Sequence, residues 1–269
     1  MSSSRVFVVL ATALSAAACS PRHTAPLIRP SASSVALTGG PAKSMVYLAR
    51  TSDGVIAIDL GWWGGERAFK DALRDLRADP SQVTDVFLTH THRDHIGALH
   101  LVRHAQVHVS EKELPRLTGE RLHQGIVPRA AEHVKPSGLP KPNELVARTF
   151  STDTMFVFGV DTLRAYLVSG HTAGSSVYLF RGTLFLGDAV TYSRLEGFKS
   201  ARWIYSDDAS QAAANLKALW ARLPKDGVSY VCTAHAHCRA YAADLLRELH
   251  APADVVESTR QLDSRPHGR

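Results

Sequence analysis

The stretch "DVFLTHTHRDHIGALH", residues 85–100, places His90, His92, Asp94 and His95 within six positions, directly after a short apolar run. Residues two apart at an extended strand end point to the same side, so His90 and His92 can chelate one ion. Desolvating three imidazoles and a carboxylate together costs free energy unless something binds them. The stretch therefore predicts a metal site in the loop that follows a strand.

The spacing H-x-H-x-D-H is more specific than a histidine-rich loop exposed to solvent. It arises by chance in roughly two of a thousand chains of this length and composition. Neutral imidazole and carboxylate ligands suit zinc, iron or manganese. No cysteine lies nearby, which argues against a structural zinc site built on thiolates.

Three later stretches offer further ligands, each just after an apolar run. His171 follows "AYLVSG", Asp188 ends "TLFLGD", and His235 and His237 follow "SYVCTA". Each has an ordinary interpretation taken alone, because a histidine at a strand end is often merely hydrogen-bonded and an aspartate often caps a helix. Four strand ends with the same chemistry favour one shared site.

Short β-branched and alternating runs predict strands, and longer runs with helical spacing predict helices. Strands are expected over 44–50, 54–60, 83–89, 105–110, 155–159, 162–168, 175–180, 183–188 and 229–235. Helices are expected over 66–79, 96–104, 208–223 and 240–250. Strands lead and a helix follows, twice over, which predicts two β-rich halves with helices outside, an α/β layered architecture.

The N-terminus is typical of a targeting segment. Arg5 and the apolar run 6–18 predict a signal peptide over residues 1–18, because about 13 apolar residues are too few to span a bilayer. The sequence "LSAAACSP" resembles a bacterial lipobox, which predicts an exported protein held in the cell envelope or periplasm by a lipid on Cys19. The alternative is ordinary cleavage after Ala18 and a soluble secreted protein.

The rest of the chain divides by composition. Residues 19–43 are rich in Pro, Ser and Ala and predict a tether, residues 44–250 a single folded domain, and residues 251–269 a flexible tail. The net charge of +6 comes from scattered Lys and Arg without a run of five, which argues against a nucleic-acid partner. The sequence leaves open the oligomeric state and whether Cys232 and Cys238 pair.

With these motifs in view, the chain resembles the metallo-β-lactamase superfamily over residues 44 to about 250. The shared pattern is H-x-H-x-D-H, then G-H-T, then G-D, then a late histidine, with an early "AIDLG" that contains Asp59 and Gly61. The resemblance implies a four-layer αββα sandwich with metals at one edge. Asp59 is expected to support the site rather than to bind metal.

The resemblance also implies two zinc ions per chain. It assigns the first metal to His90, His92 and His171, the second to Asp94, His95 and His235, and the bridge between them to Asp188. His235 is preferred to His237 because it lies closer to the strand end. Asp94 is expected to be catalytic as well, orienting a metal-activated hydroxide and accepting its proton.

Resemblance to this family makes a hydrolase of a small ester, lactone, thioester or amide the leading hypothesis. Asp188 weighs against a true β-lactamase, since those relatives carry a cysteine ligand or lack an aspartate there. The alternatives are an iron-dependent oxidoreductase similar to persulfide dioxygenase, a true β-lactamase, and a metal-bearing binding protein without turnover. Aromatic residues at 62–63 and 192–205 either wall a substrate site or simply cover the sandwich edge.

Overall fold

The computed structural model describes five segments of the chain, namely residues 33–37, 43–131, 141–193, 197–224 and 226–241. The expected signal peptide, Cys19, the C-terminal tail and nearly all of the helix expected over 240–250 lie outside these segments. None of the described helices is long and apolar enough to cross a membrane.

The first sheet has the order β1-β2-β3-β4-β5-β6. Its strands are β1 (Ser33–Leu37), β2 (Met45–Arg50), β3 (Val55–Ile58), β4 (Val83–Phe87), β5 (Gln106–Ser110) and β6 (Val146–Phe150). The strands from β3 to β6 run parallel, so their carboxyl ends meet at one edge of the sheet. β1 pairs with β2 and lies within the tether expected over 19–43, so that segment contributes an edge strand instead.

The second sheet has the order β14-β13-β10-β9-β8-β7, and β11 and β12 form a separate hairpin. These strands are β7 (Thr154–Phe158), β8 (Asp161–Leu167), β9 (Ser176–Phe180), β10 (Thr183–Phe185), β11 (Val190–Ser193), β12 (Gly197–Ser200), β13 (Tyr230–Thr233) and β14 (Ala236–Ala240). Only the pair β10 and β13 is parallel in this sheet of described strands.

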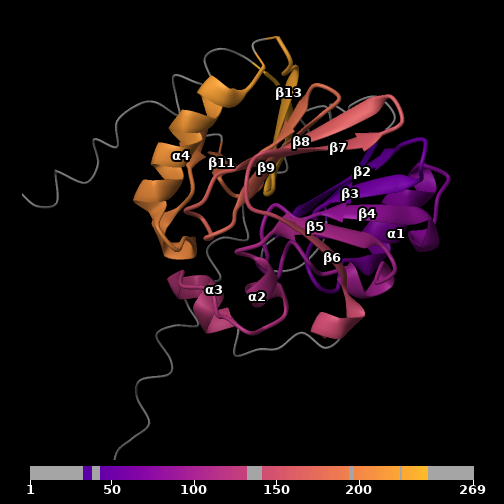
Figure 1. Ribbon diagram of the computed structural model, residues 1–269, viewed down its shortest axis with the longest axis horizontal. Coiled ribbons are helices and arrows are strands. Elements are labelled where there is room, and N and C mark those ends of the chain that lie inside the picture. Colours follow the sequence, from indigo (N-terminus) through magenta and orange to yellow (C-terminus); the bar gives the residue numbers. More distant parts are fainter. Residues whose placement is uncertain (1–32, 38–42, 132–140, 194–196, 225, 242–269) are drawn as a thin grey trace, which may run out of the picture.

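Two longer helices cover the outer faces of the sheets, on opposite sides in Figure 1. They are α1 (Glu66–Asp75) and α4 (Ala209–Arg222). The shorter helices are α2 (Leu114–Leu117) and α3 (Ile126–Ala131), with single 3₁₀ turns η2 (Pro80–Gln82), η3 (Leu99–Leu101), η4 (Pro142–Glu144) and η5 (Trp203–Tyr205). The helix expected over 96–104 is therefore only the single turn η3.

Successive residues along β2 belong to two different apolar clusters, and the core as a whole divides into three such clusters. Phe69 of α1 packs against the first sheet, and Leu216 of α4 packs against the second. Between the sheets, Phe87 and Tyr178 are fully buried and their rings lie 5.5 Å apart. Burying each such side chain stabilises the fold by about 1.5–3 kcal/mol. The layers run helix, sheet, sheet, helix, which confirms the expected αββα sandwich.

Candidate metal centre

The candidate ligands come from both sheets and gather at one edge of the sandwich. Four of them lie in the loop after β4, at the carboxyl end of that parallel strand. The others lie between β8 and β9, after β10, and in the turn between β13 and β14. The structure thus brings together all seven residues singled out in the sequence, which are His90, His92, Asp94, His95, His171, Asp188 and His235.

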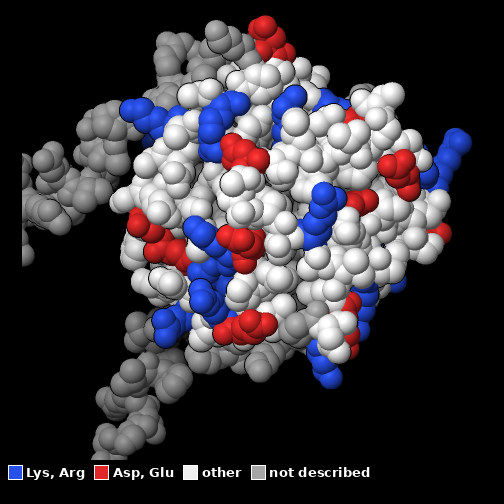
Figure 2. Space-filling model, viewed as in Figure 1, with Lys and Arg blue, Asp and Glu red and all other residues white. Residues whose placement is uncertain are grey.

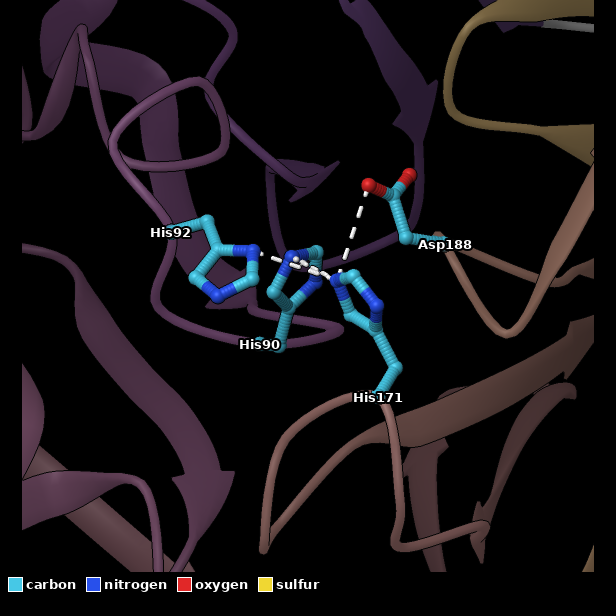
Figure 3. Close-up of side chains that lie close together, drawn as sticks. All are labelled: His90, His92, His171 and Asp188. Carbon is cyan, nitrogen blue, oxygen red and sulfur yellow. Dashed lines mark hydrogen bonds and ion pairs between the residues drawn. The ribbon is translucent and has the colours of Figure 1, made fainter. Parts of the chain in front are cut away.

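The first group consists of His90, His92, His171 and Asp188 (Figure 3). His171 Nε2 lies 3.2 Å from His90 Nε2, 3.1 Å from His92 Nδ1 and 3.6 Å from Asp188 Oδ2. A tetrahedral ion with bonds of about 2.0–2.1 Å separates its ligand atoms by about 3.3 Å. The spacing of the first group therefore fits one ion.

The second group consists of Asp94, His95, Asp188 and His235. His235 Nε2 lies 3.1 Å from Asp188 Oδ2 and 3.4 Å from Asp94 Oδ2, and His95 Nε2 lies 3.7 Å from a carboxylate oxygen of each aspartate. Asp188 belongs to both groups. His237 lies on β14 and is in neither group.

Two buried atoms of the second group have no hydrogen-bond partner among the described residues. They are His95 Nε2 and Asp188 Oδ1. Leaving a buried polar atom unpaired costs about 1–3 kcal/mol, and more for a charged group. A metal cation would satisfy both atoms, so the residues present fit a metal ion.

Asp59 and Thr89 fix the orientation of two candidate ligands. Thr89 Oγ1 donates to Asp59 Oδ2 at 2.8 Å, and the Thr89 amide donates to Asp59 Oδ1 at 2.8 Å. Since the Thr89 hydroxyl proton is used, His90 Nδ1, 3.1 Å away, donates to that oxygen. His95 Nδ1 donates to Asp59 Oδ2 at 2.8 Å. Both rings therefore turn Nε2 toward the centre, and Asp59 has the supporting role expected.

The same reasoning assigns the tautomers of His171 and His235. Ser206 Oγ donates to the Arg202 carbonyl at 2.7 Å, so it accepts from His171 Nδ1 at 3.2 Å. His235 Nδ1 lies 2.7 Å from the Lys43 carbonyl, which only accepts, so His235 also carries its proton on Nδ1. Each ring again presents Nε2 to its group.

Burial keeps the histidines of the first group uncharged. It lowers the pKa of His171 to about 4, although Asp188 opposes the shift. Burial, together with the neighbouring histidines, also holds the pKa values of His90 and His92 well below the usual range. Neutral imidazoles are the form that binds metal, so this group needs no histidine deprotonation at pH 7.

Carboxylates give the second group the opposite character. Asp188 raises the pKa of His235 to about 9. Burial lowers the pKa of His95, but Asp59, Asp94 and Asp188 outweigh it and hold that pKa well above its usual value. Burial likewise raises the pKa of Asp188, yet His235 and His95 outweigh it and keep that pKa well below the usual range.

Glu113 ties the loop of the first two histidines to the loop of His171. This fully buried carboxylate accepts from the Thr91 amide at 3.0 Å and from Thr91 Oγ1 at 2.6 Å through one oxygen. Its other oxygen accepts from the Gly174 amide at 2.9 Å. The sequence did not point to Glu113, because it lies in a polar segment without clear periodicity.

Asp207 provides a second tie that the sequence did not reveal. It accepts from Arg116 Nη2 at 2.8 Å, from the Gln124 amide at 2.8 Å and from the Ala173 amide at 3.1 Å. These contacts join α2, the loop before α3 and the loop of His171 to Asp207. The first group is therefore braced by the buried hydrogen bonds of Glu113 and by those of Asp207.

Comparison with known proteins agrees with this geometry. A family model described as the metallo-beta-lactamase superfamily matches residues 39–237, which include all seven candidate ligands. A search of curated proteins finds no match.

Solved structures share the fold. One is a metallo-beta-lactamase family protein, TTHA1429, from Thermus thermophilus, with a TM-score of 0.60 and 18% identity over 86% of this chain and 80% of that one. Another is a metallo-beta-lactamase from Pontibacter korlensis, with a TM-score of 0.57 and 24% identity over 77% and 85%. A third is TTHA1623 in a di-iron-bound form, with a TM-score of 0.56 and 23% identity over 76% and 93%. With its family match, its αββα sandwich and its histidine and aspartate groups, the chain belongs to the metallo-β-lactamase superfamily.

Proposed function

We propose that the chain is a dinuclear, zinc-dependent hydrolase of a small ester, lactone, thioester or amide. The observation that carries the proposal is the position of Asp188, which contributes to both groups. One carboxylate between two ligand sets favours a pair of ions over two independent ones. When bound, zinc ions supply Lewis acidity and lower the pKa of a coordinated water toward about 7.

The ligand sets divide as the groups do. His90, His92 and His171 would hold one ion, Asp94, His95 and His235 would hold the other, and Asp188 would contribute to both sets. Hydrogen bonds to Thr89, Asp59 and Ser206 keep the rings of His90, His95 and His171 in the tautomers that turn Nε2 toward the centre. Nothing in these side chains has to reorient for the centre to form.

Asp94 is the residue we propose for proton transfer. Burial raises the pKa of its carboxyl, so it accepts a proton more readily than an exposed aspartate does. Its carbonyl oxygen accepts from Ser44 Oγ, which fixes the backbone there. Asp94 orients the attacking water, takes its proton and delivers it to the leaving group.

An apolar rim beside the first group supports substrates that carry an apolar group. The rim consists of the exposed residues Leu122, Ile126, Val127, Trp203 and Tyr205. The backbone of Gly125 lies directly against the Tyr205 carbonyl, so α3 and η5 pack together. Tyr205 directly precedes Ser206, the partner of His171. Exposed apolar side chains next to a reactive centre are typical of substrate contact.

The surface charge supports a small-molecule substrate. In Figure 2, basic and acidic side chains are interspersed over the face shown. Arg222 pairs with Asp153, and Arg181 pairs with Asp161. A nucleic-acid partner would favour a continuous basic surface, so we do not propose one.

A second candidate is an iron-dependent oxidoreductase with the same ligands. The observation that favours it is the structure of TTHA1623 in a di-iron-bound form. Imidazole and carboxylate ligands accept iron as well as zinc, so the ligand types alone do not separate the two metals.

Metal content and turnover test the proposal together. Protein purified without added metal should contain about two zinc ions per chain by elemental analysis and should hydrolyse members of an ester and lactone panel. Iron in place of zinc, with oxygen-dependent turnover and no hydrolysis, would establish the second candidate instead.

A further inference from the structure

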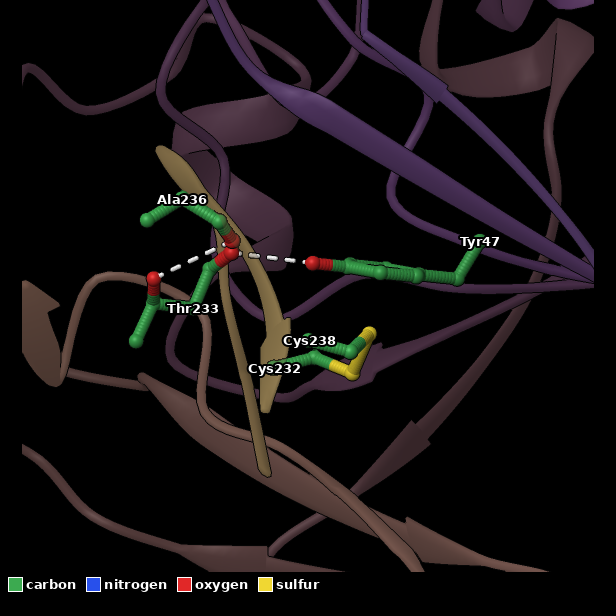
Figure 4. The surroundings of a disulfide bond; sticks show 5 residues. All are labelled: Tyr47, Cys232, Thr233, Ala236 and Cys238. Carbon is green, nitrogen blue, oxygen red and sulfur yellow. Dashed lines mark hydrogen bonds between the residues drawn. A yellow bond between two sulfur atoms is a disulfide. The ribbon is translucent and has the colours of Figure 1, made fainter. Parts of the chain in front are cut away.

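A disulfide closes the turn that carries His235 (Figure 4). Cys232 lies on β13 and Cys238 on β14, six positions apart, and His235 is the middle residue of the closed loop. Both cysteines are buried in the core between the two sheets. The disulfide therefore anchors both ends of the turn to the interior.

Backbone pairing alone holds this turn weakly. β14 is at the edge of its sheet and pairs with β13 alone among the described strands. The register of that pair shifts between Val231 and Thr233, so the regular ladder is interrupted just before His235. An edge strand with an irregular register is held weakly by its backbone hydrogen bonds alone.

Hydrogen bonds from several elements also hold the residues up to His235. Tyr47 Oη donates to the Thr233 carbonyl at 2.9 Å, and the Met45 amide donates to the Ala234 carbonyl at 2.8 Å. The Ala234 amide donates to the Gly187 carbonyl at 3.1 Å, and His235 Nδ1 donates to the Lys43 carbonyl at 2.7 Å. All four bonds precede β14, and the disulfide ties β14 back to β13 just beyond His235.

His235 also differs from the other histidine ligands in exposure. Its side chain is 34% exposed, whereas those of His95 and His171 are 0% and 2% exposed. No buried carboxylate comparable to Glu113 braces its loop in the part of the chain that the structure describes. The position of His235 therefore depends on the turn and on the bond from its Nδ1 to the Lys43 carbonyl.

We infer that the Cys232–Cys238 disulfide is a positioning element for His235, so that binding of the second metal ion depends on the oxidised state of these cysteines. The inference rests on the proposed dinuclear centre. Breaking the disulfide weakens metal binding by the second group and leaves metal binding by the first group unchanged, because none of the first group's histidines lies on this turn. A buried disulfide is also typical of oxidising compartments, which supports the proposal that the protein is exported.

The test is a zinc titration of the metal-free protein in the oxidised wild type and in the Cys232→Ala/Cys238→Ala variant. We expect two equivalents in the wild type. In the variant, the first equivalent should bind with unchanged affinity and the second should bind at least about tenfold more weakly, the scale expected when a ligand loses its support. Equal affinities for both equivalents in the two proteins would overturn the inference while the dinuclear proposal stands.

A wild type that binds only one equivalent would instead overturn the dinuclear proposal, and the inference with it. A double-mutant cycle adds the readout that separates positioning from general stabilisation. His235→Ala should weaken the second equivalent, and removing the cysteines in the His235→Ala protein should then change nothing further. Additive losses would show that the disulfide does not act through His235.

Reduction of the wild type provides a second route if the cysteine variant folds poorly. A phosphine supplies two electrons, the sulfur–sulfur bond becomes two thiols, and the phosphine becomes its oxide with oxygen from water. Titration of free thiols should confirm the reaction, and the second equivalent should weaken as in the variant. Loss of both equivalents in the variant and in the reduced protein would overturn the inference, since the disulfide would then support the whole fold.

Discussion

The two ligand groups share Asp188, yet they are built differently. The first group has three buried histidines that burial keeps neutral, and hydrogen bonds that Glu113 and Asp207 accept brace its loops. The second group has two carboxylates, two histidines with raised pKa values, and a partly exposed turn closed by a disulfide. One group is prepared for metal by burial, and the other by charge.

This difference predicts an order of metal binding. The first group presents neutral nitrogens and loses no histidine proton when it binds. The second must release protons from His95 and His235, but its carboxylates compensate the charge of a cation better. We therefore expect the first group to fill at lower metal concentration near neutral pH.

The largest expected effect comes from removing the shared ligand. Asp188→Ala should abolish the second ion and weaken the first, and hydrolysis should fall by more than about 100-fold, since even partners outside the ligand set change metal sites by about 10–100-fold. Asp188→Asn is the matched control of the same shape, and it should lose the second ion as well. Two ions retained in either variant, by elemental analysis, would show that the groups are independent.

The second largest expected effect is a difference between the two groups in how zinc affinity depends on pH. His235 has a pKa of about 9, so below that pH it binds a proton that the metal must displace. Apparent affinity of the second group should rise about tenfold per pH unit for each displaced proton between pH 6 and 9. The first group should be nearly flat over this range, because the pKa of His171 is about 4. Zinc titrations at several pH values measure the affinity of each group. Equal slopes of affinity against pH would show that the two groups do not differ in protonation.

Supporting residues give the next smaller effect. Asp59→Asn should lower the metal affinity of the second group about 10–100-fold, because His95 loses its carboxylate partner. Ser206→Ala should lower the metal affinity of the first group only about tenfold, because the partner that His171 loses is a neutral hydroxyl. Metal competition assays compare the two variants. A stronger effect of Ser206→Ala than of Asp59→Asn would reverse this ranking.

The smallest effect concerns the apolar rim. Trp203 is 68% exposed, so its truncation should not disturb the core. Trp203→Ala should raise KM several-fold for an ester with an apolar acyl chain, with kcat and the content of both metals unchanged. Arg202 precedes it in the chain, so an unchanged metal content also shows that the Arg202–Ser206 contact survives. An unchanged KM would show that the apolar rim does not contact the substrate.

Much of the centre could be predicted from the sequence because each candidate ligand directly follows an apolar strand. His171, Asp188 and His235 lie at strand ends that the fold brings to one edge. Local pattern was enough to find these residues. Their division into two groups came from the family resemblance, and the structure places them in the same two groups.

Parts of the fold escaped prediction for identifiable reasons. β6 is mostly exposed at a sheet edge, so its sequence lacks the apolar pattern of a buried strand. The helix expected after His95 is limited to one turn, where the backbone at Gly97 packs directly against Trp62 and Trp63. Glu113 and Asp207 join residues far apart in the chain, and no local pattern reports such contacts.

The most direct test of two inequivalent metal sites is anomalous diffraction from crystals of the zinc-loaded protein, recorded on both sides of the zinc edge. Two peaks should appear on either side of Asp188, one beside His171 and the other beside His235. At limiting zinc, the peak beside His171 should be the stronger. A single peak, or two peaks with neither next to Asp188, would contradict the shared centre.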